Sequence, residues 1–263
     1  MPDATCQMLQ VRYRVLLLNI GLLRGCSEAM LQRMAQFFTT EFYARDDVVI
    51  QEGDYGSEMY VLVQGTVGVL HGSGAVVVED SVAGEGSCFG ELALLTKSQQ
   101  RRQHSIVAKT FLTVACLARA DFETFIGLFP DDRRNLLINC LLQHDITTED
   151  AQDYDVEGIS AENIEDKLKE IFHSIFTSAG QEHYGDQGVI CGHAMAPCVK
   201  SNGNLSQNKV EELVQKLYTG GEVDFRSFCQ LALGDMAARF PSVVARKLQR
   251  PNAAPVITTL KIL

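Results

Sequence analysis

The stretch VVIQEGDYGSEMYVLVQGTVGVL, residues 48–70, decides the fold class of this chain. Short runs of β-branched and aromatic residues alternate in it with glycine-rich turns, and the pattern continues to about residue 118. Strands separated by turn residues at a spacing of roughly 8–12 residues are typical of an antiparallel sandwich or barrel. The sequence therefore predicts an antiparallel, jelly-roll-like β-roll that begins near residue 41.

Helical periodicity flanks this β region on both sides. Residues 11–40 have apolar residues at helical spacing, with Ser27 as the expected N-cap of a second helix. Helical spacing returns at 120–128, and Asp131 is expected to cap a further helix that runs to about His144. We therefore predict an α+β domain in which helices flank the β-roll.

An acidic stretch, ITTEDAQDYDVEGISAENIED, follows these helices. Many carboxylates and few apolar residues are typical of a solvated linker. Beyond it, residues such as Ile164, Leu168 and Phe172 fall on one helical face, which predicts an all-α domain. The predicted divisions are N-terminal helices at 1–40, the β-roll with its closing helices at 41–145, an acidic linker at 146–160, a helical domain at 161–240 and a tail at 241–263.

The composition limits the possible partners. The 263-residue chain has a formal net charge of −10, whereas nucleic-acid binding depends on basic residues that neutralise phosphates, so no nucleic acid is expected. No apolar run reaches the roughly 20 residues that span a membrane. None of the eight cysteines forms a Cys-x-x-Cys pair, which predicts reduced thiols in a cytoplasmic protein. The protein could also belong to a membrane-adjacent, ciliary or flagellar assembly. Cys191, His193 and Cys198 match no common zinc pattern, so no metal is expected.

The segment FGELALLTKSQQRRQHSI, residues 89–106, has the residue types that a nucleotide needs. The carboxylate of Glu91 can accept hydrogen bonds from ribose hydroxyls, and Gly90 lets the backbone approach a phosphate. Arginine offers a fixed fork of donors to a phosphate. A single arginine suits a cyclic phosphodiester better than a triphosphate, for which the chain has no phosphate-binding GxxxxGK[ST] loop.

Three motifs together, VQG at Gly65, EGSCFGELALL, and RR-x-x-S-I-V-A, resemble the cyclic nucleotide-binding domain family, most closely its channel-type members. The resemblance covers about residues 12–145 and implies a β-roll whose last helix, about 131–144, closes over the base. It implies that Gly90 approaches the phosphate, Glu91 binds the ribose 2′-hydroxyl and Arg102 binds the phosphate. The ligand-binding residues predicted on this basis are Gly90, Glu91, Leu92, Ala93, Arg102, Gln103 and His104.

Two positions depart from the family pattern. Gln103 and His104 stand where the family has small residues, and the loop SQQ before the arginines is about two residues longer. If these side chains point out of the roll, the phosphate cradle survives; if they point in, it is blocked. Both readings therefore stay open at the level of sequence.

The C-terminal domain resembles a degenerate pair of EF-hands, with Gly188-Val-Ile190 and Gly221-Glu-Val223-Asp224-Phe225 as the cores of two loops. Calcium needs oxygen ligands at defined loop positions. The first loop offers His183, Gly185, Gln187 and Ala194 there, and Ser227 stands where the second needs a glutamate. The resemblance implies a metal-free pair whose groove accepts a protein partner. The alternative is a plain helical bundle.

No nucleophile, base and orienting group occur in a recognisable catalytic pattern, so we do not expect an enzyme. The sequence predicts a regulatory module that binds a cyclic nucleotide, cAMP or cGMP, in the β-roll. The change is relayed to a protein partner through the last helix of the roll and the C-terminal domain. The alternative is a vestigial pocket in a structural docking module of a channel or a cytoskeletal, for example ciliary, assembly.

Overall fold

The structure, a computed structural model, divides into two compact units, and each is described by itself. The first unit contains residues 1–143 and 149–159, and the second contains 144–148 and 160–263. The residues that the structure describes are 13, 16–18, 20–71, 78–83, 86–97, 101–147, 149–154, 156–178, 189–191, 196–219 and 222–245.

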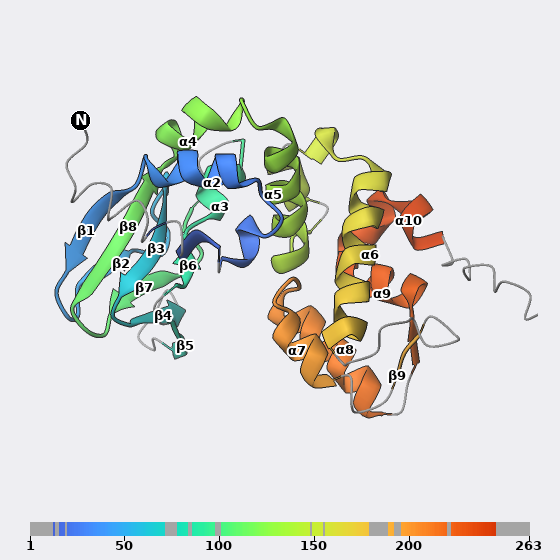
Figure 1. Ribbon diagram of the computed structural model, residues 1–263. Helices are drawn as coiled ribbons and strands as arrows, with labels where there is room; N and C mark the ends of the chain where they lie inside the picture. The colour runs from blue at the N-terminus through green and yellow to red at the C-terminus, as the bar shows by residue number, and fades with distance from the viewer. Residues whose placement is uncertain are drawn as a thin grey trace, which may run out of the picture. The chain divides into compact units, whose positions relative to one another are not determined.

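Two four-stranded antiparallel sheets form the body of the first unit (Figure 1). The first sheet contains, in spatial order, β1 (Thr39–Tyr43), β8 (Leu112–Ala118), β3 (Glu58–Gln64) and β6 (Cys88–Phe89). The second contains β2 (Val48–Ile50), β7 (Ser105–Ala108), β4 (Val67–His71) and β5 (Val78–Ala83). This confirms the predicted antiparallel β-roll.

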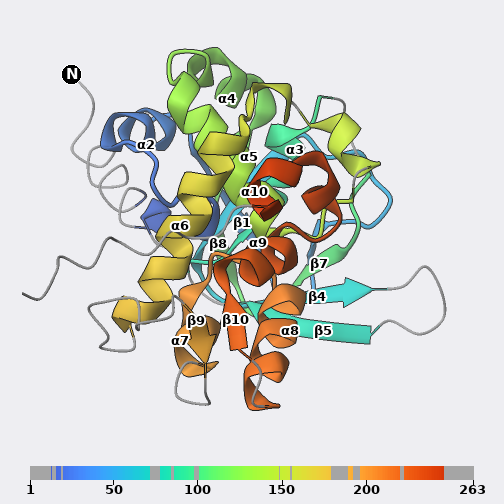
Figure 2. The ribbon, with the colours of Figure 1, turned by 90° about the vertical axis from the view of Figure 1, so that its right-hand side faces the viewer.

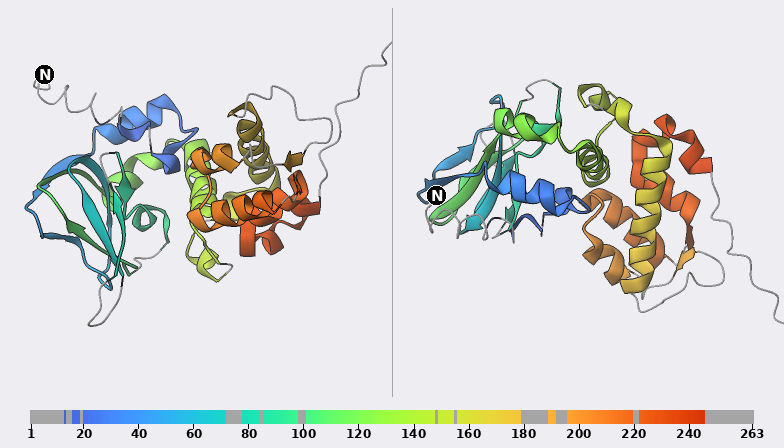
Figure 3. Two further views of the ribbon diagram at one scale, coloured as in Figure 1. Left: turned by 90° about the horizontal axis from the view of Figure 1, so that it is seen from below. Right: turned by 45° about the horizontal axis from the view of Figure 1, so that its top comes forward.

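The hydrophobic core of the roll lies between the two sheets, which face each other in Figure 3. Strands β3 and β8 contribute Leu62, Leu112 and Val114 from one sheet, and β7 contributes Ile106 and Ala108 from the other. Successive side chains of a strand point to opposite faces of its sheet, so every second side chain of these strands enters this core. The apolar runs that marked the strands in the sequence therefore also build the core.

Helices flank the roll as predicted. They are η1 (Gly21–Leu23), α2 (Glu28–Ala35), α3 (Leu92–Leu95), α4 (Arg119–Ile126) and α5 (Pro130–Gln143). The Ser27 side chain accepts a hydrogen bond from the amide of Met30, which confirms Ser27 as the N-cap of α2. Helix α5 begins at Pro130, so Asp131 lies in its first turn instead of capping it. A proline suits the first turn because its missing amide would have no helical partner there.

Polar side chains on one face of α5 bind the backbone between η1 and α2. The carboxylate of Asp132 accepts hydrogen bonds from the amide and the hydroxyl of Ser27 at 2.6 and 2.7 Å. The side-chain amide of Asn139 donates to the carbonyl oxygens of Leu22 and Arg24 at 2.7 and 2.9 Å, and Asn139 is only 2% exposed. These bonds fix α5 to the start of the domain.

Replacing Asn139 with alanine is expected to lower the free energy of unfolding by about 1–3 kcal/mol, because the buried carbonyl of Leu22 then loses this donor. Asn135→Ala is the matched comparison. Asn135 also donates to the Arg24 carbonyl, but that oxygen keeps its bond from Asn139 when Asn135 is removed. Urea denaturation measures both variants, and an equal or larger loss in Asn135→Ala would contradict this assignment.

The acidic stretch that the sequence assigned to a linker is folded onto the first unit over residues 149–159. It contains the short helices η2 (Asp150–Asp153) and η3 (Val156–Gly158). Tyr154 is buried and pairs with Thr96 at the end of α3 in an isolated β-bridge. Apolar side chains at intervals within the acidic run anchor this segment, so it is not a free linker.

The second unit is mainly helical, and its ribbon is clear in Figure 2. Its elements are α6 (Ala161–Ser178), β9 (Val189–Cys191), α7 (Ala196–Asn202), α8 (Gln207–Tyr218), β10 (Glu222–Asp224), α9 (Phe225–Leu233), η5 (Gly234–Arg239) and α10 (Pro241–Ala245). The ring of Phe172 on α6 packs against Phe225 and Phe228 of α9, with centroids 5.4 and 5.1 Å apart. The predicted apolar face of α6 is buried, as are Leu213, Val214 and Leu217 of α8.

Strands β9 and β10 pair antiparallel, with Ile190 opposite Val223. Each strand is followed by a helix, so the unit contains two helix–strand–helix segments joined by a small sheet. The assignment of this unit to the EF-hand type stays a prediction. Loop positions 183, 185, 187 and 194 lie outside the described residues, and the amide of Ser227 donates to the Asp224 carboxylate that caps α9.

Two kinds of feature are missing from the described residues. No helix among them is long and apolar enough to cross a membrane. No group of three or more histidine, cysteine or carboxylate side chains that could hold a metal ion occurs in that part of the chain.

Candidate functional site

The turn from β6 into α3 places Gly90 where no other residue fits. Its φ of +77° lies in the left-handed region, which side chains disfavour. A Cβ atom at this position would lie 2.9 Å from the carbonyl oxygen of Glu58 and 2.7 Å from Nη1 of Arg102. Gly90 therefore allows Arg102 and the Glu58 backbone to pack closely against this turn, and its predicted approach to a phosphate stays a prediction.

Arg102 lies against this turn and is fixed there by backbone carbonyls. Its Nη1 donates to the carbonyl oxygen of Gly90 at 3.1 Å and its Nη2 donates to that of Glu58 at 2.7 Å. The Glu58 carboxylate lies 3.7 Å from Nη2, and the arginine side chain is 11% exposed. A guanidinium has five N–H donors in a planar fork, and these two carbonyl oxygens fix the position of the fork beside the Gly90 turn.

The loop from Gly53 to Gly56 contacts this arginine and holds it in position. The amide of Gly53 donates to the Arg102 carbonyl at 2.9 Å, and the Arg102 amide donates to the Asp54 carbonyl at 2.7 Å. A Cβ atom at Gly56 would lie 2.0 Å from Nε of Arg102, so the guanidinium packs directly on the Gly56 backbone. The loop thus depends on a glycine to keep Arg102 in position.

Arg101, the neighbouring arginine, has a different environment. Its guanidinium lies over the ring of Tyr55, 4.6 Å from the centroid, and donates to the carbonyl oxygen of Gly53 at 2.7 Å. Arg101 is exposed, whereas Arg102 is largely covered. The two neighbouring arginines therefore differ in exposure and in their contacts.

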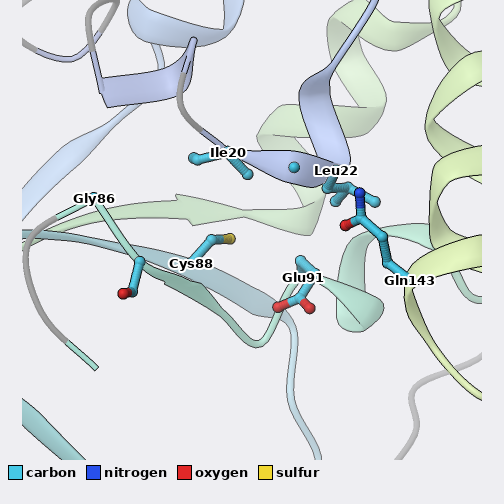
Figure 4. A pocket seen from close by; sticks show the side chains of 8 residues that line it. Ile20, Leu22, Gly86, Cys88, Glu91 and Gln143 are labelled. Atoms are coloured by element: carbon cyan, nitrogen blue, oxygen red, sulfur yellow. The ribbon is translucent and has the colours of Figure 1, made fainter. Parts of the chain in front are cut away.

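A cavity of about 250 Å³ opens beside the same turn (Figure 4). Figure 4 shows Cys88, Glu91 and Gln143 around this space, from β6, the turn before α3 and the last residue of α5. The lining residues are Ile20, Gly21, Leu22, Gly86, Ser87, Cys88, Glu91 and Gln143. Small-molecule pockets begin at about 300 Å³, so the cavity is slightly smaller than a typical pocket for a whole small ligand.

Gln143 is a site residue that the sequence did not reveal. Its Nε2 atom is buried, and no hydrogen-bond partner for it occurs among the described residues. A buried amide without a partner is costly, which a ligand with an acceptor atom in the cavity would relieve. The sequence offered no signal beyond its place near the end of a helix.

Cys88 presents a thiol to the same cavity. Burial raises the pKa of this thiol well above its ordinary value, and the negative charge of Glu91 raises it further. The side chain is therefore a neutral thiol at physiological pH and contributes a polarisable, mostly apolar wall.

The predicted site residues have different environments. Gly90, Glu91 and Arg102 come together, although twelve positions separate the first and last of these in the chain. Leu92 and Ala93 begin α3, and the amide of Ala93 donates to the carbonyl oxygen of Gly90. Of the seven predicted residues, Glu91 alone is among the residues that line the cavity.

Gln103 and His104 were predicted to decide whether the phosphate cradle survives. Gln103 is exposed at the surface, so it does not fill the interior of the roll. His104 is half-buried, and its Nδ1 atom is covered. The loop SQQ at 98–100 lies outside the described residues.

Comparison with known proteins identifies the β-roll. A family model described as the cyclic nucleotide-binding domain matches residues 40–127. Residues 40–127 belong to the cyclic nucleotide-binding domain family. The match includes Gly90, Glu91 and Arg102 and confirms the resemblance stated from the sequence motifs.

Curated relatives of this domain include cyclic nucleotide-gated channels. Cyclic nucleotide-gated channel beta-3 of Canis lupus familiaris is 31% identical over 121 residues, which cover 45% of this chain and 15% of the channel. Channel alpha-2 of Bos taurus is 26% identical over 122 residues, which cover 45% of this chain and 18% of the channel. The chain thus spans less than a fifth of the length of these relatives.

Solved structures with a similar fold include the regulatory domain of Toxoplasma gondii PKA crystallised with cAMP. It is 22% identical, with a TM-score of 0.44, and the match covers 51% of this chain and 50% of that one. A cyclic nucleotide-binding-like protein from Brucella abortus is 23% identical, with a TM-score of 0.40, and the match covers 44% of this chain and 97% of that one.

Proposed function

We propose that this protein is a regulatory module that binds a purine 3′,5′-cyclic nucleotide, cAMP or cGMP, at the turn between β6 and α3. The observation that carries the proposal is the position of the Arg102 guanidinium, held on the carbonyl of Gly90 directly beside Glu91. These residues combine a donor fork for a phosphate with a carboxylate for ribose hydroxyls. The membership of residues 40–127 in the nucleotide-binding family supports the same ligand class.

The bound ligand would extend between Arg102 and the cavity. In this arrangement the cyclic phosphate takes the place of a carbonyl oxygen as an acceptor for Arg102, and Glu91 accepts from the ribose 2′-hydroxyl. The base then lies in the cavity, where the amide of Gln143 and the thiol of Cys88 contact it. No group in this arrangement acts on the phosphodiester, so the ligand is released unchanged.

The regulatory part of the proposal is that ligand binding is relayed to a protein partner through α5 and the helical unit. A paired helix–strand–helix arrangement can offer a groove to an amphipathic helix. The cytoplasmic location predicted from the cysteines is also part of the proposal. Six cysteines form no disulfide, which fits a reducing compartment: Cys26, Cys88, Cys116, Cys140, Cys198 and Cys229.

The ribose contact provides the test of this function. Titration calorimetry with cAMP and with 2′-deoxy-cAMP is expected to show a loss of roughly tenfold or more for the deoxy ligand, because a hydrogen bond to a charged group contributes about 1.5–3 kcal/mol. The cGMP pair is measured in the same way. In Glu91→Gln the difference between each ligand and its deoxy form is expected to shrink, because the charged acceptor is gone.

Two controls complete the test. 5′-AMP has the same base and ribose but an open phosphate, and it is expected to bind more weakly than cAMP. Glu149→Gln changes an exposed carboxylate outside the site and is expected to leave both affinities unchanged. No binding of either cyclic nucleotide at millimolar concentration would refute the proposed function and favour the structural docking module.

A further inference from the structure

The chain passes between the two units immediately after the cavity. Gln143, whose amide lines the cavity, is the last residue of the first unit's main segment, and His144 begins the second unit. Asp145 follows one residue later. An extended chain spans at most about 3.3–3.6 Å per residue, so Asp145 stays within roughly 7 Å of Gln143 in any conformation of the backbone.

Asp145 is firmly bound to the start of α8. Its Oδ1 accepts a hydrogen bond from the hydroxyl of Ser206 at 2.6 Å, and its Oδ2 accepts one from the side-chain amide of Asn208 at 2.6 Å. The ammonium of Lys209 lies 3.8 Å from Oδ1 and also donates to the His144 carbonyl at 3.3 Å. We call these contacts the Asp145 clamp.

The clamp is only partly buried, because the side chain of Asp145 is 44% exposed whereas its cationic partner is covered. The side chain of Lys209 is 9% exposed, and a buried ammonium is stable only when it is paired. Ser206 is also buried, and its hydroxyl oxygen accepts from the Lys209 amide as the N-cap of α8. Displacing Asp145 would therefore disturb both the charge pair and the start of the helix.

We propose that the Asp145 clamp transmits occupancy of the cavity to α8. A ligand that bonds the amide of Gln143 changes the position or the mobility of the end of α5. Because Asp145 is so close in the chain and is fixed to α8, that change must either move the start of α8 with it or break the clamp. The helical unit then responds to the ligand without contacting it, and the coupling free energy is the difference in ligand affinity between the two states.

This inference rests on the proposed function, and hydrogen exchange on the full chain tests both separately. Deuterium uptake of peptides from Gln207–Tyr218 is measured with and without cAMP and cGMP, and calorimetry on the same samples reports binding. In the unmodified protein, a saturating ligand is expected to change the exchange rate of the α8 amides about threefold or more. In Asp145→Ala the ligand is expected to bind and to leave exchange in α8 unchanged.

Asn208→Ala is a second variant, because Asn208 is exposed and its loss removes one clamp bond without unpairing Lys209. It is expected to reduce the response in α8 partly, so the test survives if Asp145→Ala fails to fold. Glu149→Ala removes an exposed carboxylate that is not part of the clamp and is expected to respond like the unmodified protein.

The outcomes separate the two proposals. Absence of binding to the unmodified protein would overturn the proposed function and the coupling with it. Binding without any change in α8 would overturn the coupling and leave the proposed function in place. A response in α8 that persists in both clamp variants would overturn the clamp as the route of the coupling.

Discussion

Arg102→Ala is expected to lower the affinity for cyclic nucleotide by roughly 100-fold or more. Hydrogen bonds to charged groups contribute about 1.5–3 kcal/mol each, and about 1.4 kcal/mol corresponds to tenfold in affinity. The phosphate would also lose the one guanidinium placed beside Gly90 and Glu91. Titration calorimetry at constant salt measures the loss.

Two matched variants make this result specific. Arg101→Ala removes the same charge from the adjacent, exposed position, and we expect a change of no more than a few-fold. Arg102→Lys keeps the charge but loses the fork, so its affinity should fall between those of the unmodified protein and Arg102→Ala. Equal losses in Arg101→Ala and Arg102→Ala would show that the arginines act only through long-range charge. Thermal melting of each variant checks that it is folded.

Gly56→Ala is expected to weaken nucleotide binding almost as much as Arg102→Ala, although Gly56 is not among the residues that line the cavity. An alanine Cβ would lie 2.0 Å from Nε and 2.1 Å from Cζ of Arg102, so the guanidinium must move away from its position on the Gly56 backbone. The clash is with the end of a flexible side chain, which can move away. We therefore expect a large loss of affinity with a small change in melting temperature.

A double-mutant cycle isolates this mechanism. In the Arg102→Ala background the clash is absent, so adding Gly56→Ala is expected to cost almost nothing further in affinity. Gly127→Ala is the control, because a Cβ at Gly127 meets no atom within 4 Å. An additive loss in the double variant would mean that Gly56 acts on the ligand directly and not through Arg102.

The parts of the site that are close in sequence could be predicted from it. The Gly90–Glu91 pair and Arg102 lie within one short segment whose motif carries both the spacing and the chemistry. Gly56 and Gln143 could not be found in this way. Gly56 contributes to the site because its backbone packs directly against Arg102. Gln143 contributes because the end of its helix lies at the cavity. Both arrangements depend on contacts between residues far apart in the sequence.

The fold was predictable for a similar reason. Short runs of β-branched residues that are separated by glycines indicate strands from local sequence alone. The number and the regular spacing of these strands indicate antiparallel pairing. The segment 149–159 shows the limit of composition. The segment contains many acidic residues, and its composition therefore suggested a linker. Four of its apolar residues are nevertheless buried: Ala151, Tyr154, Val156 and Ile159.

Binding of a cyclic-nucleotide phosphate by Arg102 is tested most directly by nitrogen-15 NMR of the arginine side chains. The Arg102 Nε–H signal is assigned from its loss in Arg102→Lys, and the spectrum is followed during titration with cAMP and cGMP. Binding of the phosphate at Arg102 predicts a saturable shift of the Arg102 signal and little change at Arg101. An Arg102 signal that does not move at millimolar concentrations of either nucleotide would contradict it.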